Sequence, residues 1–160
     1  MKNLLNELVH QNDYIGLDIE GKVTLIKELV KKLGITSIIE EITEVLQSEK
    51  EEEMYVVSLL LRDVCTRKGK RVDFDEVVAQ FRSAVENSSI FEIMNQNLYS
   101  SDRLIRETTY RTFGLTCFTQ NTQYLKEAEV YYKKYFPDQL EDLEFEHKWL
   151  INLGKDESRV

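Results

Sequence analysis

Apolar residues recur along most of the chain at intervals of three and four residues, which is the spacing of one face of an α-helix. The clearest stripe runs through residues 23–33, and Gly34 follows it as a residue suited to the left-handed conformation at a helix end. No segment alternates between apolar and polar residues, and no Asn-Gly or Asp-Gly pair marks a β-hairpin. The pattern predicts an all-α protein.

Polar residues that can cap helices divide this pattern into about eight or nine helices. Asp73 with Glu76, and Ser89 with Glu92, match the capping box, in which two side chains three residues apart bond each other's backbone N–H groups. Further helix starts are expected at Thr36-Ser37, near Ser101, at Thr122, and at Asp138 after the helix-stopping Pro137.

Short connections organise the predicted helices into pairs. Most connections are two to five residues long, so neighbouring helices should lie antiparallel. The pairs begin near residues 18, 51, 89 and 122, which is the spacing of helix-pair repeats. We therefore expect antiparallel hairpins stacked as a short solenoid, or an irregular bundle, forming one domain over residues 1–154. Residues 155–160 should form a frayed tail.

One segment resembles a known helical repeat. Its residues are Asp102, Ile105, Arg106, Thr109, Phe113 and Gly114, and it is similar to the second helix of a HEAT repeat. In that family, an Asp and an Arg of this helix pair between successive repeats, so the resemblance implies stacked hairpins. Thr109 stands where the family prefers Ala. The match occurs once and covers 13 of the 160 residues.

The charge balance narrows the class of partner. The formal net charge is −8 and the isoelectric point is about 4.9. A nucleic-acid binder needs a basic surface that displaces counterions from phosphates, so we expect a cationic partner and no direct contact with nucleic acid. Cys65 and Cys117 lie within apolar helical patterns, which indicates buried thiols and no disulfide framework.

The apolar runs of the sequence are too short for a signal peptide or a membrane-spanning helix. Glu7 interrupts the N-terminal apolar run, so that run does not match a signal peptide, and the run over residues 54–61 is too short to span a membrane. We expect a cytoplasmic protein that does not contact membranes.

Two motifs that could carry chemistry are better explained by helix structure. Residues 16–22 match most of a phosphate-binding loop, but Val23 replaces the Ser or Thr that holds magnesium, and Asp18 suits a helix cap. The Asp73-Phe74-Asp75 motif falls at a helix start, where carboxylates cap. Neither His10 nor His147 has a partner at metal-binding spacing. We expect no metal site, no cofactor and no enzymatic activity.

Acidic residues are concentrated in two segments. Residues 36–53 carry a net charge of −6 and residues 138–146 carry −5, so the other 133 residues carry +3. Such runs are commonly solvated helix faces, but concentrated like charge also steers a basic partner. The predicted contact residues are Glu141, Asp142 and Glu146, then Glu40, Glu41 and Glu44, with the aromatic neighbours Trp149 and Tyr132.

The tyrosines of residues 124–135 allow two interpretations. They cover two faces of one predicted helix, which suits either a helix buried in a stack or an interface, where tyrosine is common.

These features favour a binding protein. A small, acidic, cytoplasmic chain without a catalytic motif is similar in profile to bacterial immunity proteins. The sequence therefore suggests an inhibitor that binds and neutralises a basic protein, with a nuclease toxin as the leading example because nucleases have basic clefts. The alternative is a HEAT-like adaptor or regulatory scaffold for protein–protein interactions.

Overall fold

The computed structural model describes residues 3–65, 75–115 and 119–145, and every element in these ranges is helical. This confirms the all-α prediction. The elements are α1 (Leu4–Gln11), the 3-10 helix η1 (Tyr14–Gly16), α2 (Ile19–Leu33), α3 (Ile35–Gln47), α4 (Glu51–Cys65), α5 (Glu76–Glu86), α6 (Ile90–Asn97), α7 (Arg103–Leu115) and α8 (Thr119–Tyr135). Residues 137–145 form a further helical segment.

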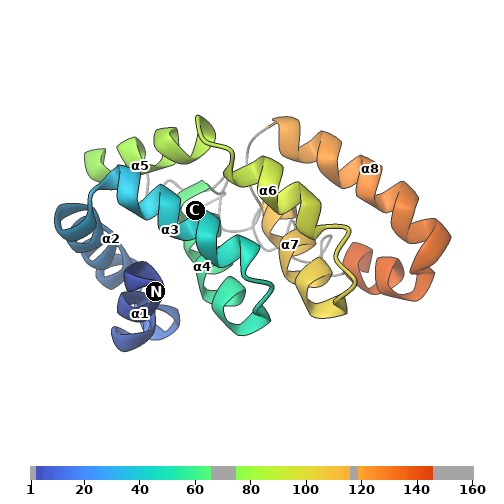
Figure 1. The fold of residues 1–160 in the computed structure, drawn as a ribbon, viewed down its shortest axis with the longest axis horizontal. Helices are drawn as coiled ribbons and strands as arrows, with labels where there is room; N and C mark the ends of the chain where they lie inside the picture. The colour runs from blue at the N-terminus through green and yellow to red at the C-terminus, as the bar shows by residue number, and fades with distance from the viewer. Residues whose placement is uncertain (1–2, 66–74, 116–118, 146–160) are drawn as a thin grey trace, which may run out of the picture.

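Two helical hairpins form the centre of the molecule (Figure 1). The first consists of α3 and α4, and the second consists of α6 and α7. They stack in two layers, because α3 packs against α6 and α4 packs against α7. Helices α1 and α2 cover one end of the stack, and α8 packs against α7 at the other.

The stacked units differ in register from the pairs expected from sequence. The sequence spacing predicts that the helix beginning near residue 51 forms a pair with the helix that follows it. In the structure, that helix is the second member of its hairpin, and the stacked hairpins begin at Ile35 and Ile90. The reason is α5, which packs against α2, α3 and α4 and therefore does not form the second helix of a stacked unit.

A continuous apolar core runs through the stack. All the helices from α1 to α8, and residues 137–145, contribute buried side chains to it. Three tyrosines, Tyr14, Tyr110 and Tyr132, are among its largest fully buried side chains. Cys65 is buried as predicted, whereas Cys117 lies outside the described residues.

The helix starts agree only in part with the sequence prediction. Asp18 caps α2 as expected, by accepting from Gly21 N at 2.7 Å. Helix α5 is capped by Asp75, whose Oδ1 accepts from Val77 N at 2.9 Å, so the start predicted at Asp73 is wrong, and Asp73 itself lies outside the described residues. Asp75, which is two residues closer to the helix than Asp73, is therefore the N-cap residue.

The Ser89–Glu92 capping box does not form either. Ser89 is the N-cap residue of α6 by position, but its side chain makes no capping hydrogen bond. The hydroxyl of Ser88 accepts from Ile90 N at 3.2 Å instead.

Three more helices begin earlier than predicted. Helix α3 follows α2 directly through Gly34, which has a φ of +80°, so Thr36 and Ser37 lie inside its first turn. Helix α8 begins at Thr119, ahead of Thr122. The last segment begins at Pro137, ahead of Asp138, because proline fits the first position of a helix, where no N–H is needed.

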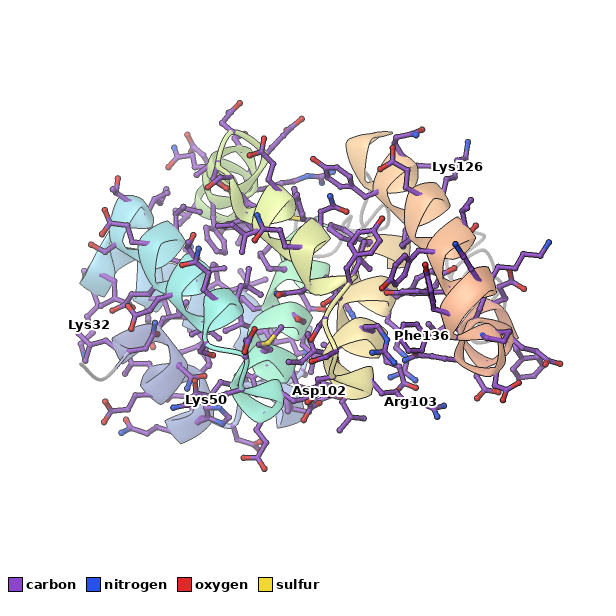
Figure 2. All side chains as sticks on the ribbon, turned by 45° about the vertical axis from the view of Figure 1, so that its right-hand side comes forward. Lys32, Lys50, Asp102, Arg103, Lys126 and Phe136 are labelled. Atoms are coloured by element: carbon purple, nitrogen blue, oxygen red, sulfur yellow. The ribbon has the colours of Figure 1, made fainter. Side chains whose placement is uncertain are left out.

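In the segment that resembles a HEAT repeat, one charged residue caps α7 and another joins α7 to residues 137–145. Asp102 caps α7 by accepting from Leu104 N at 2.8 Å. Arg106 is only 4% exposed and donates to Gln139 Oε1 at 2.9 Å and to the Ser100 carbonyl at 2.8 Å. Its guanidinium lies 3.7 Å from the ring centre of Phe136, which Figure 2 shows beside α7. Arg106 thus fastens residues 137–145 to α7.

Candidate functional site

A polar pocket of about 440 Å³ lies between α1, α3 and α4. We call it the α1–α3–α4 pocket. Its walls combine carboxylates, amides and one lysine with a small apolar surface. The lining residues are Asn3, Asn6, Glu7, Glu44, Val45, Ser48, Lys50 and Glu53.

Hydrogen bonds from α3 hold α1 against one side of this pocket. The Glu41 carboxylate accepts from Leu5 N at 2.8 Å and from Leu4 N at 3.3 Å, so it satisfies N–H groups in the first turn of α1. Asn3 Nδ2 donates to the Glu41 carbonyl at 2.8 Å, and Asn3 Oδ1 accepts from Asn6 N at 2.9 Å. These bonds fix the position of Asn6 and Glu7 relative to α3.

The turn between α3 and α4 forms the other side. Ser48 Oγ donates to the Val45 carbonyl at 2.6 Å and accepts from Lys50 N at 3.3 Å. Glu49 has a φ of +59°, which reverses the chain within three residues. The reversal brings Lys50 and Glu53 to the pocket that Glu44 also lines, and Figure 2 labels Lys50 at this turn.

Carboxylates dominate the charge of the pocket. Glu7, Glu44 and Glu53 come from three different helices, and Lys50 is the cation among the lining residues, which leaves a net charge of −2. Lys50 Nζ lies 3.9 Å from Glu53 Oε1, beyond hydrogen-bond distance, and its side chain is 69% exposed. Such an exposed pair contributes little, so Lys50 does not neutralise the site.

Two lining groups have unused acceptor capacity. Glu44 is exposed, and it makes no hydrogen bond or ion pair with the described residues. Asn6 Oδ1 is buried, and no donor reaches it from the part of the chain that the structure describes. An unpaired buried acceptor such as Asn6 Oδ1 is costly, and the exposed Glu44 carboxylate is free to accept N–H donors from a ligand.

The structure divides the predicted residues of α3 into two roles. Glu44 lines the pocket, and Glu40 is exposed one turn earlier on the same helix. Glu41 instead fastens α1 to α3, so its carboxylate is occupied within the protein.

The predicted residues near the end of the chain do not join this site. Residues 137–145 lie at the opposite end of the stack from α1 (Figure 1). Glu141 is exposed, and Asp142 lies 3.6 Å from Arg103 in an exposed ion pair. Tyr132 is fully buried and donates to the Leu98 carbonyl, so it packs in the core and does not face a partner. Glu146 and Trp149 lie outside the described residues.

Lys22, the basic residue of the loop-like motif, is engaged within the fold. Its Nζ lies 3.3 Å from Asp63 Oδ2, and the same oxygen accepts from the Tyr14 hydroxyl at 2.5 Å. Burial, followed by the charge of Asp63, raises the pKa of Tyr14 far above its ordinary value. This cluster joins η1, α2 and α4.

Sequence reasoning did not select Glu7, Glu53 or Asn6 as site residues. Glu7 was recognised only as a polar break in an apolar run, and Glu53 only as part of an acidic segment. Their spacing along the chain contains no signal of the pocket, because the pocket depends on how α1 packs against α3.

Comparisons with family models, with curated proteins and with solved structures found no match. Among the described residues, none of the helices has the length and apolar character needed to cross a membrane.

Proposed function

We propose that this protein is a cytoplasmic inhibitor that binds and neutralises a basic protein through the α1–α3–α4 pocket and the acidic surface around it. The leading partner is a nuclease toxin, which would make the chain an immunity protein. The observation that carries the proposal is the gathering of Glu7, Glu44 and Glu53 around one pocket. Glu52, which is exposed in the first turn of α4, adds a further carboxylate on one of these three helices.

An acidic protein surface can compete with the phosphates of a nucleic acid for a basic cleft. An enzyme that cuts RNA or DNA binds its substrate in a basic cleft. A rigid surface rich in carboxylates can occupy such a cleft in place of the phosphates, and complementary charge raises the association rate. These acidic residues lie on packed helices, so little backbone conformational entropy is lost when a partner binds.

A second candidate is an adaptor or scaffold resembling HEAT proteins. It is favoured by the stacking of the α3–α4 hairpin on the α6–α7 hairpin, since stacked hairpins provide extended binding surfaces. The exposed side chains of Val130 and Tyr135 on α8 would supply apolar contacts in that case.

The test begins with the partner captured by the full chain, which is then purified and assayed alone. The inhibitor proposal expects one basic partner with nuclease activity, which an equimolar amount of this protein suppresses. The affinity should fall steeply as salt rises, because exposed charges are screened. Several unrelated partners, bound equally well at low and high salt, would support the adaptor instead and contradict the inhibitor.

A further inference from the structure

We infer that the α1–α3–α4 pocket receives the guanidinium group of a single arginine side chain from the basic partner. This inference rests on the proposed function, because it names the group by which the partner is held.

The unused acceptors lie on several walls. The Glu44 carboxylate has no partner among the described residues, and Glu53 meets Lys50 only at 3.9 Å. Glu7 Oε1 accepts from Gln11 at 3.1 Å, which leaves its second oxygen available. Acceptors on three helices suit a donor group that reaches in several directions at once.

The separation of these carboxylates favours a cation that can donate to several of them at once. Within the described residues, no three acidic, histidine or cysteine side chains are close enough together to hold a metal ion. A planar guanidinium carries five N–H donors in a fixed fork and is weakly hydrated, so it can bridge separated carboxylates. An ammonium group concentrates its charge at one point and would satisfy fewer of them.

Two further features suit an arginine side chain. Val45 gives the wall an apolar surface, against which the methylene stem of an arginine can pack. Asn6 also lines the pocket, and its buried Oδ1 has no donor among the described residues.

Lys50 acts as a competitor within the protein. It lines the pocket, yet it makes no close ion pair, so an arriving guanidinium can displace it at little cost. Replacing Lys50 by a neutral residue should therefore strengthen binding of a cation to this pocket.

The experiment uses methylguanidinium as the probe and methylammonium as its matched control, followed by nuclear magnetic resonance of the full chain. Methylguanidinium should give saturable shifts of the Asn6 and Glu44 signals, and methylammonium should bind more weakly. Glu44→Gln should weaken methylguanidinium binding by roughly threefold, and Lys50→Gln should strengthen it by about twofold, as expected for exposed charge pairs. Glu40→Gln, which removes an exposed carboxylate outside the pocket, should change it little.

Absence of saturable shifts, equal binding of the two probes, or equal effects of Glu44→Gln and Glu40→Gln would overturn the inference. Glu44 is exposed and unpaired among the described residues, so its replacement should leave the fold intact, which thermal unfolding of each variant checks. If these results fail while the partner still binds in a salt-dependent manner, the acidic surface stands and only the arginine pocket is lost. If methylguanidinium binds as expected but no basic partner exists, the proposed function fails instead.

Discussion

The carboxylate of Glu41 shows that acidic residues on one helix can serve different purposes. Because it accepts from two N–H groups of α1, its loss leaves both without this partner. We predict that Glu41→Ala lowers the free energy of unfolding by about 1 kcal/mol, as the loss of a helix cap does. Urea denaturation measures this change.

Glu40→Ala is the matched control, since Glu40 is the preceding residue and is exposed. Its effect should stay within about 0.5 kcal/mol. Equal effects of the two substitutions would mean that Glu41 does not hold α1.

The buried hydroxyl of Tyr14 makes stability depend on alkaline pH. Burial raises its pKa in the folded protein, so the folded state keeps the proton after the unfolded chain has lost it. Stability from this group is complete below the ordinary tyrosine pKa of about 10 and is lost as the pH rises above it. We predict that the free energy of unfolding falls above that pH, by up to about 1.4 kcal/mol per pH unit for each such tyrosine. Urea denaturation between neutral and alkaline pH measures it.

Tyr14→Phe separates this effect from the rest of the protein. The variant should be less stable at neutral pH, because the hydrogen bond to Asp63 is lost. Above the tyrosine pKa its stability should fall less steeply than that of the wild type. A residual fall is expected, because burial also raises the pKa of Tyr110 and Tyr132. Parallel curves for wild type and variant would contradict this account.

At the scale of elements, the junction of α2 and α3 depends on one backbone conformation. Gly34 has a φ of +80° and a ψ of 149°, a region that residues with a Cβ avoid, and a Cβ there would meet nothing within 4 Å. We predict that Gly34→Ala lowers the free energy of unfolding by about 1–3 kcal/mol through backbone strain alone. Chemical denaturation measures the loss.

Thr36→Ala tests the competing prediction from sequence, in which Thr36 and Ser37 cap α3. The structure places both inside the helix, with no side-chain cap at Gly34. The substitution should therefore change stability by no more than about 0.5 kcal/mol. A loss as large as that of Gly34→Ala would favour the cap at Thr36.

Sequence alone predicts helices better than it predicts their junctions. Apolar stripes identify α2 and α3 because burial of one face imposes the helical period. The start of α5 was misplaced because Asp73 and Asp75 both suit a cap, and only the fold decides which of them accepts from Val77. Local pattern cannot rank two candidates of the same chemistry that lie two residues apart.

The candidate site was only partly predictable for a related reason. Charge concentration pointed to Glu44, but Glu7 and Glu53 join it through the packing of α1 and α4 around α3. Tyr132 was predicted as a contact residue, but it is buried in the core, where its hydroxyl donates to the Leu98 carbonyl. Such contacts between distant segments leave no signature in local spacing.

At the scale of the whole molecule, the two acidic segments lie on different parts of the stack. Helix α3 and the start of α4 surround the pocket, whereas residues 137–145 lie beyond α7, where Arg103 offsets part of their charge (Figure 1). Under the proposed function, both segments would contribute to long-range steering of a basic partner, but only the first would provide short-range contacts in the pocket.

The measurement that tests the central claim most directly is the affinity of the purified partner for two charge-reversed variants. One carries Glu44→Lys and Glu53→Lys in the pocket, and the other carries Asp138→Lys and Glu141→Lys on the exposed surface of the last segment. Both change the net charge equally. We predict that the pocket variant binds at least about tenfold more weakly and that the other stays within about threefold of the wild type, since close charge pairs outweigh distant ones. Equal losses, or a larger loss for the second variant, would contradict the assignment of the binding site to the α1–α3–α4 pocket.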